Sequence, residues 1–260
     1  MIYGIITVDY EDFIKDNHKW NAMNNIIVPA NKIMDFFDSY GIPVTFYCNV
    51  AEYIRMEQLG HCNAKLLYEH MNNIMKRGHE IQMHFHERTL HVDIGQDGQW
   101  KKSDFVEGDN ILLRNIPEFE QGVRILRSIN PDTNSYRGGG YLIEPIYDNF
   151  TYLHELGFKT DSSLGWSRRS KNFPPFLVNI HGLTEVPICK VDGIRWDMSA
   201  SPRFVYAVNN IINNYQHFSK DMFIVMMGHT KQKIFWSDMT EILNIHKHNI
   251  HFITMSQVAT

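Results

Sequence analysis

The chain has 260 residues, of which 43% are hydrophobic and 21% charged, so it can bury a sizeable core and is long enough for one large α/β domain or two small ones. Its formal net charge of −4 and lack of a long basic run exclude a surface typical of nucleic-acid binding. The cysteines Cys48, Cys62 and Cys189 are odd in number and far apart, which excludes a disulfide framework and indicates reduced thiols.

Residues 1–13, MIYGIITVDYEDF, lack the basic region of a secretory signal. No apolar run approaches the roughly 20 residues needed to span a bilayer. We therefore expect no transmembrane segment and a cytoplasmic location.

In the first half of the chain, apolar strand-like runs alternate with segments of helical periodicity. We expect strands at residues 2–8, 43–48 and 80–85, and helices at residues 24–40 and 64–76. The polar stretch 87–108 is too long for a simple connection, and such loops are often functional lids.

The second half continues the alternation. We expect helices at residues 111–129, 145–156, 204–215 and 235–246, and strands at residues 133–136, 158–161, 184–188, 222–227 and 250–255. No linker composition and no internal repeat interrupts the pattern. It predicts one domain over residues 1–260, built as a parallel α/β barrel or sheet.

Enzymes built as parallel barrels carry their chemistry at the carboxyl ends of the strands. Chemically capable residues follow the predicted strands here in the same way. They are Asp9 and Glu11, His84 and His86, Arg137, Asp161, and His229. This ordered placement favours a catalytic site over scattered polar residues.

His84 and His86 stand at positions i and i+2 near a strand end, so their imidazoles share one face. Two imidazoles with one carboxylate, from Asp9 or Glu11, form a frequent ligand set for catalytic zinc, and the other carboxylate could act as general base. The alternatives are a hydrogen-bonded structural histidine pair and an acidic loop or helix N-terminal turn at residues 9–12.

The segment Arg-Gly-Gly-Gly-Tyr at residues 137–141 combines a permanent cation with a backbone that can approach a ligand closely. Arg137 could hold a carboxylate through two hydrogen bonds; the alternative is a flexible loop with a surface arginine. His229 follows the apolar strand at residues 222–227. It could be catalytic or could only hydrogen-bond the following loop.

These features together resemble the polysaccharide deacetylases of the NodB-homology type, carbohydrate esterase family 4, over nearly the whole chain. The most specific likeness is Gly-His-Glu-Ile at residues 78–81 followed by His84 and His86. The other family motifs are similar to Thr-Val-Asp-Tyr-Glu-Asp at 7–12, Arg-Gly-Gly-Gly-Tyr at 137–141, Asp-Ser-Ser at 161–163 and Val-Met-Met-Gly-His at 225–229. The resemblance implies a distorted (β/α)7-type barrel.

The sequence departs from the family pattern at several positions. The family's second metal histidine falls at Arg88, which cannot bind a metal, so His86 or, failing that, His91 must replace it. Asp9 and Glu11 are separated by Tyr10, which leaves open which carboxylate binds the metal. Gly165-Trp166 stands where the family has Asp-Trp, and Gly228 is inserted before His229. His79 is expected to cap or pack.

The resemblance implies a metal-dependent hydrolase that removes an N-acetyl group from a sugar of a bacterial surface polysaccharide, such as an O-antigen, or of its precursor. Glu11 (or Asp9), His84 and His86 would hold a divalent ion, expected to be zinc. Asp9 would be the base, Arg137 would orient it, His229 would be the acid, and Asp161 would lie near the metal or orient His229. Gly139, Gly140, Tyr141 and Trp166 would contact the substrate.

Two alternatives remain open. One is hydrolysis of another C–N bond, such as that of a cyclic imide or amide, which relatives of this fold resemble in chemistry. The other is an inactive barrel that has lost its metal through Arg88 and binds glycan without turnover. The paired carboxylates and His229 favour the enzyme, because a binding protein needs no acid and base.

Overall fold

The computed structural model describes residues 1–12, 20–94, 100–101, 111–141, 143–164, 175–188, 190–191, 194–195, 198, 204–215, 219–234 and 236–259. The strands of its main sheet are β1 Ile2–Tyr10, β2 Val44–Asn49, β3 Glu80–Phe85, β6 Ser135–Gly138, β7 Thr160–Asp161, β8 Val178–Ile180, β9 Leu183–Glu185, β12 Met222–His229 and β13 His251–Phe252. Two small antiparallel pairs lie outside it: β4 Asp93–Ile94 with β5 Trp100–Lys101, and β10 Lys190–Val191 with β11 Ile194–Arg195.

The helices follow in chain order. The α-helices are α1 Val28–Asp38, α2 Val50–Gln58, α3 Asn63–Lys76, α4 Pro117–Ile129, α5 Ile146–Glu155, α6 Phe204–Tyr215 and α7 Trp236–His246. Short helical turns are η1 Ala22–Ile27, η2 Glu87–His91, η3 Leu113–Asn115, η4 Gly139–Tyr141 and η5 Ser256–Ala259. None of the helices that the structure describes has the length and apolar character needed to cross a membrane.

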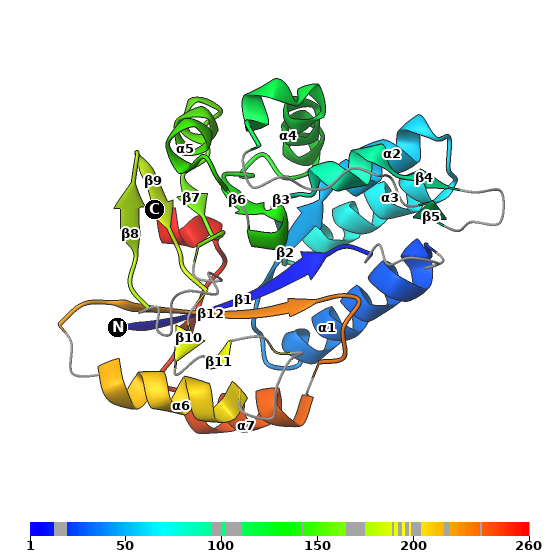
Figure 1. The fold of residues 1–260 in the computed structure, drawn as a ribbon. Helices are drawn as coiled ribbons and strands as arrows, with labels where there is room; N and C mark the ends of the chain where they lie inside the picture. The colour runs from blue at the N-terminus through cyan, green and yellow to red at the C-terminus, as the bar shows by residue number, and fades with distance from the viewer. Residues whose placement is uncertain are drawn as a thin grey trace.

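The main sheet has the strand order β12-β1-β2-β3-β6-β7-β9-β8, and β13 pairs with the start of β1 (Figure 1). All neighbours are parallel except β8 and β9, which form a hairpin. The sheet curls into a partial barrel with helices around it (Figure 1). The predicted distorted (β/α)7-type barrel of mostly parallel strands is therefore confirmed.

Most predicted elements are found close to their expected bounds. The strand at residues 80–85 and the helix at residues 204–215 coincide with β3 and α6. Helix α2 was not predicted, because it follows β2 directly and no turn residue separates the two. The predicted helix at 111–129 is a 3-10 turn followed by α4, which starts at Pro117, a residue suited to the first helical turn.

Alternation along β1 divides the core into an outer and an inner layer. Ile6, Val8 and Tyr10 belong to the large core cluster shared with the helices. Ile5 faces the opposite way, into a smaller apolar cluster inside the curl that includes Tyr47 of β2. Thr7 and Asp9 share the parity of Ile5, so β1 carries polar side chains along the inner face toward its carboxyl end.

The segment Gly-His-Glu at residues 78–80 has a structural role at the amino end of the barrel. The Glu80 carboxylate accepts hydrogen bonds from the backbone N–H groups of Met255 and Ser256 and from the hydroxyl of Thr45. His79 Nδ1 accepts a hydrogen bond from Val44 N, so His79 packs as expected. Glu80 of this segment therefore holds residues 255–256 against the barrel.

His70 of α3 links two elements near the carboxyl end of β1. Its Nε2 donates to Asn31 of α1 at 3.2 Å, and its Nδ1 accepts from the Tyr10 hydroxyl at 2.9 Å. Burial lowers the pKa of His70 to about 4. The unfolded state, with a pKa near 6.5, therefore binds a proton that the folded state excludes between about pH 6.5 and pH 4.

The stability that this neutral histidine provides is present above about pH 6.5 and is lost as the pH falls toward 4. We expect the wild-type protein to lose about 2 kcal/mol more unfolding free energy than His70→Gln between pH 7.5 and pH 5. Urea unfolding of both proteins at the two pH values measures the difference. Equal losses would show that His70 does not titrate differently in the folded state.

Candidate metal centre and catalytic residues

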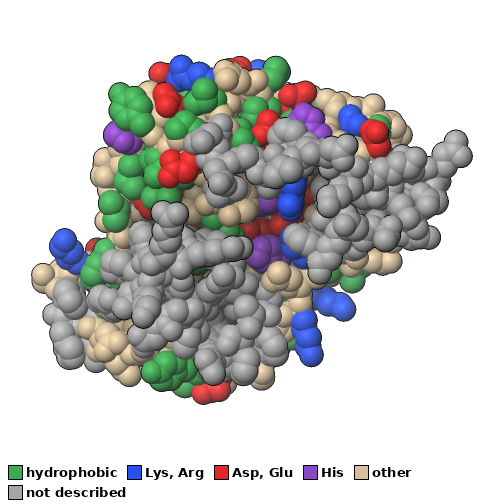
Figure 2. All heavy atoms as spheres, in the orientation of Figure 1, with side chains coloured by type: hydrophobic (Ala, Val, Ile, Leu, Met, Phe, Trp, Pro, Cys, Tyr) green, Lys and Arg blue, Asp and Glu red, His purple; other side chains and the backbone are tan. Residues whose placement is uncertain are grey.

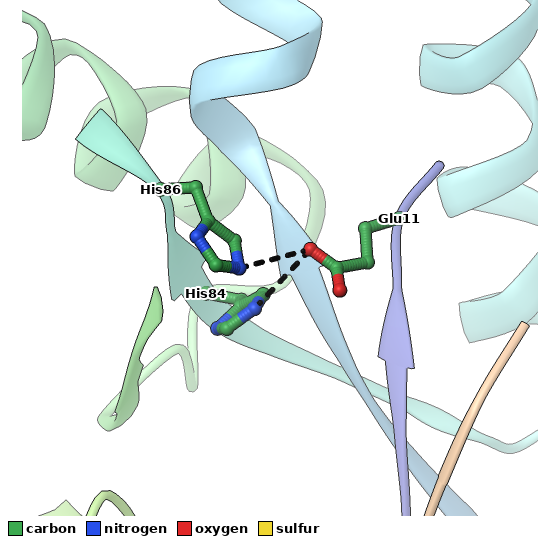
Figure 3. Close-up of side chains that lie close together, drawn as sticks. All are labelled: Glu11, His84 and His86. Carbon is green, nitrogen blue, oxygen red and sulfur yellow. Dashed lines mark ion pairs between the residues drawn. The ribbon is translucent and has the colours of Figure 1, made fainter. Parts of the chain in front are cut away.

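Glu11, His84 and His86 form a group whose ligand atoms all lie within 4.8 Å of one another (Figure 3). Glu11 directly follows β1, His84 belongs to β3, and His86 follows β3. The Oε2 atom of Glu11 lies 3.5 Å from His84 Nε2 and 3.1 Å from His86 Nε2. All three side chains are buried, so the carboxyl ends of two strands present one carboxylate and two imidazoles to the same point.

The hydrogen bonding of His84 suits a metal ligand. Its Nδ1 donates to the backbone carbonyl of Arg137 at 2.8 Å, which leaves the lone pair on Nε2. That Nε2 atom is buried and has no hydrogen-bond partner among the described residues. A buried orphan nitrogen that faces a carboxylate and a second imidazole fits a divalent ion of the zinc type.

The structure thus brings Glu11, rather than Asp9, to the two imidazoles, and His86 rather than His91. His91 is an exposed residue at the end of η2, and Arg88 lies in the same turn. Among the described residues, Glu11, His84 and His86 are the only such group of potential ligands.

Gly139 supports the ring of His86. A Cβ atom at this position would lie 2.4 Å from His86 Nδ1 and 2.7 Å from the carbonyl oxygen of Phe85. Only glycine lets the loop after β6 pass so close to the imidazole. Gly139 was predicted to contact the substrate; its position shows that it packs against a candidate ligand.

Gly139→Ala is expected to displace His86 and to weaken binding of zinc at least about 10-fold, the lower range for loss of a group that orients a metal ligand. Competition titration with a chelator measures the affinity. The control is Gly41→Ala, at a positive φ of 67° with open space around it. That variant should lose stability but keep its zinc affinity, and equal zinc affinity in both variants would contradict the packing role.

The outer side of Glu11 contacts the loop that follows β12. Lys231 Nζ lies 2.5 Å from Glu11 Oε1, and the Thr230 hydroxyl donates to the backbone oxygen of Glu11 at 2.9 Å. Burial alone would raise the pKa of Glu11, but the nearby His86 and Lys231 hold this pKa well below its usual range. Thr230 and Lys231 were not predicted as site residues, although both directly follow the predicted residue His229.

Arg137 holds Asp9 from inside the barrel. Its Nη1 atom donates to Asp9 Oδ1 at 2.7 Å, and its Nη2 atom donates to the hydroxyls of Thr7 and Ser162, both at 3.1 Å. The guanidinium carbon lies 4.1 Å from the ring centroid of Tyr47, and no part of the Arg137 residue is exposed. Burial raises the pKa of Asp9, but the charges of Arg137, His84 and His229 together outweigh this effect and hold the pKa below its usual value.

The second carboxylate oxygen of Asp9, Oδ2, faces His229 and Tyr141, two further residues that were predicted for the site. His229 Nε2 lies 3.5 Å and the Tyr141 hydroxyl 3.4 Å from Asp9 Oδ2. Gly140 and Tyr141 have positive φ angles of 62° and 61°, which turn the loop after β6 back over Asp9. Asp9 therefore joins Arg137, Tyr141 and His229 in one cluster beside the three candidate ligands.

Asp161 lies in a different part of the inner layer. Its carboxylate accepts from Ser163 N at 2.9 Å and from Ser163 Oγ at 2.8 Å, and its register partner on β9 is Glu185. Burial and the neighbouring Asp161 charge raise the pKa of Glu185 well above its usual value, so this carboxyl pair retains a proton. His229 Nδ1 has no hydrogen-bond partner among the described residues, so no direct bond from Asp161 orients it. Trp166 is outside the described residues.

The cluster opens on the face of the molecule that Figure 2 shows. Acidic, histidine and basic side chains gather there in a hollow near the centre of the view. The same hollow lies at the carboxyl ends of the central strands, where parallel barrels bind their ligands.

Solved structures of other proteins share this fold. Proteins assigned as polysaccharide deacetylases from Mycobacterium smegmatis and Pseudomonas aeruginosa PAO1 match with TM-scores of 0.59 and 0.60, at 16% and 10% identity. The alignments cover 99% of this chain and 88% and 89% of those chains. The Puue allantoinase matches with a TM-score of 0.59 at 11% identity, over 99% of this chain and 89% of its own.

No protein-family model and no curated protein matches the sequence. At these identities the solved structures show the fold, which is the fold of the polysaccharide deacetylases. The resemblance inferred from the motifs thus extends to the three-dimensional structure.

Proposed function

We propose that this chain is a metal-dependent carbohydrate N-deacetylase, a hydrolase that releases acetate from an N-acetylated sugar. The observation that carries the proposal is the pairing of two groups at one end of the barrel. Glu11, His84 and His86 form a buried ligand set, and Asp9 stands beside it with Arg137 and His229 as partners. A hydrolase of amides needs a metal site, a base and an acid within reach of one another.

Glu11, His84 and His86 would hold the ion. When bound, a divalent ion in such a site supplies Lewis-acid polarisation of the amide carbonyl and of water. Zinc is the ion we propose, because two imidazoles and one carboxylate leave a position open for substrate or water.

The remaining residues carry the proton transfers. Asp9, kept ionised and oriented by Arg137, accepts the proton of the attacking water. His229 in its protonated form donates a proton to the nitrogen of the leaving amine. A backbone N–H of the loop at residues 139–141 would stabilise the negative charge that develops on the carbonyl oxygen.

Measuring the zinc content of purified variants tests whether Glu11, His84 and His86 are the metal ligands. Wild-type protein should bind about one zinc ion, with nitrogen-to-zinc distances of about 2.0–2.1 Å. His84→Ala and His86→Ala should each lose most of this zinc and the acetate release that depends on it. His91→Ala is the matched control and should keep both. If His91→Ala loses the metal while His86→Ala keeps it, His91 is the third ligand.

The substrate is tested with a panel of N-acetylated sugars. We propose that the natural substrate belongs to a bacterial surface polysaccharide or its precursor, such as a nucleotide- or lipid-linked sugar of O-antigen synthesis. Acetate release that requires zinc would support the N-deacetylase. Zinc binding without acetate release, together with sugar binding, would instead identify a glycan-binding barrel.

A second candidate is hydrolysis of a cyclic amide. The specific observation is the fold match to the Puue allantoinase, whose TM-score equals that of one of the deacetylases. Ring opening of allantoin releases no acetate, so assays of both reactions on the same zinc-loaded protein separate the two functions.

A further inference from the structure

A pocket lies directly beside the candidate metal centre. It has a volume of about 300 Å³ and opens between α1 and the loop that joins β12 to α7. The described residues that line it are Pro29, Lys32, Ile33, Thr230, Lys231, Gln232, Lys233, Ile234 and Trp236. This volume is at the lower end of the range for small-molecule sites, about 300–1,000 Å³.

Thr230 and Lys231 line the pocket and also contact Glu11 of the candidate metal centre. Thr230 hydrogen-bonds the backbone of Glu11, and Lys231 contacts the Glu11 carboxylate at 2.5 Å. A substrate whose acetamide reaches the candidate metal could therefore extend another of its groups into this pocket.

The charge of the pocket is strongly positive for a chain with a formal net charge of −4. Its described lining contains three lysines and no carboxylate. Glu11 neutralises Lys231, but none of the described carboxylates forms an ion pair with Lys32 or Lys233, which are both exposed. Two lysine charges thus remain available to a ligand.

The walls of the pocket are fixed by the core. The Trp236 ring packs on Phe36 of α1 with 4.7 Å between ring centroids, and Ile33 and Ile234 are buried. Apolar walls with a few convergent charges are typical of ligand sites.

We infer that this pocket binds a phosphate group carried by the sugar substrate. The inference rests on the proposed N-deacetylase function and narrows its substrate class to sugar phosphates. Two lysine charges match the charge of a phosphate monoester, about −1.5 to −2 at pH 7, better than the single charge of a carboxylate. Lysine is also a frequent phosphate ligand because its ammonium group acts as a compact point charge.

The test compares matched probes on the zinc-loaded protein by calorimetry. N-acetylglucosamine 1-phosphate is expected to bind at least about 10-fold more tightly than N-acetylglucosamine, and added salt should reduce this preference. The double variant Lys32→Gln/Lys233→Gln should lose about 10-fold in affinity for the phosphorylated probe and for inorganic phosphate, since each exposed charge contributes a few-fold. Its affinity for the neutral sugar should be unchanged.

Lys159→Gln is the matched control, because Lys159 is exposed and precedes β7 at the opposite end of the sheet. It should bind every probe as the wild type does. Two further probes distinguish a nucleotide-linked from a lipid-linked substrate: UDP-N-acetylglucosamine and a short-chain prenyl diphosphate sugar. Both contain a diphosphate, and they differ in the group attached to it, a nucleoside or a prenyl chain. Tighter binding of either one supports the pocket and identifies the carrier.

Two results would overturn the inference: equal binding of phosphorylated and neutral sugars by the wild type, or phosphate binding that the double variant retains. Neither depends on turnover. If the lysines bind phosphate but no N-acetyl sugar releases acetate, the proposed N-deacetylase function is wrong and the inferred phosphate site is supported. If neutral and phosphorylated sugars are deacetylated with equal kcat/KM, the N-deacetylase function is supported and the inferred phosphate site is wrong.

Discussion

Arg137→Lys is expected to preserve the fold and to lower kcat by about 10²-fold, the loss that a small misplacement of a reacting group can cause. The arginine donates to Asp9, Thr7 and Ser162 with three different nitrogens while its planar group lies over Tyr47. A lysine keeps the charge but has a single ammonium group, so it cannot orient Asp9 and satisfy the other acceptors together.

The fold is expected to survive because the buried charge of Asp9 keeps a cationic neighbour. Removal of the charge, as in Arg137→Met, would leave Asp9 buried and unpaired and should cost about 3–5 kcal/mol. Arg77→Lys is the matched control, since Arg77 contacts Asp35 and Asp38 at the surface. Steady-state kinetics and thermal unfolding of both lysine variants measure the effects. Unchanged kcat in Arg137→Lys would exclude an orienting role.

His229→Ala is expected to bind zinc normally and to lose about 10²–10⁴-fold in rate on an N-acetyl sugar, the usual contribution of one acid or base. The loss should be much smaller on an aryl acetate ester, because a phenolate leaves without protonation. His229 Nε2 faces Asp9 at 3.5 Å, and the side chain is 12% exposed at the mouth of the barrel. It can therefore reach a leaving group that Asp9 and the candidate metal also approach.

The rival role for His229 is structural, and the two substrates separate the roles. A histidine that only supports the following loop would affect amide and ester hydrolysis equally. His246→Ala is the matched control: His246 is a largely buried histidine of α7 that hydrogen-bonds Asn209 of α6. That variant should lose stability and reduce both reactions alike. Equal losses in His229→Ala would place His229 in the scaffold.

Much of the architecture could be predicted from hydrophobic patterning. Runs such as residues 2–8 and 222–227 are largely apolar because both faces of these strands are buried, one by helices and one inside the curl. Polar residues at the ends of these runs differ clearly in character from the apolar residues before them. This contrast predicted Asp9 and His229, whereas His84 was predicted from its i, i+2 spacing with His86 and Arg137 from the glycines that follow it.

Elements without such contrast were missed. Helix α2 continues directly from β2, and strands β8, β10 and β11 have three residues or fewer. Short elements carry too few residues for a period to be recognised. Glu185 was missed for a related reason, because it ends the three-residue strand β9 and only its pairing with Asp161 makes it notable.

By itself, the sequence determined that the strands are mostly parallel, that their carboxyl ends carry the polar groups, and that His84 and His86 share a face, because these properties depend on local periodicity and on the alternation of strands with helices. The tertiary structure alone decided which partners meet. Lys231 contacts Glu11 across 220 positions, and Arg137 contacts Asp9 across 128. Strand order and sheet curvature set these contacts, and both depend on how the whole core packs, which no local pattern encodes. For that reason the choice of Glu11 over Asp9 beside the histidines emerged only from the folded chain.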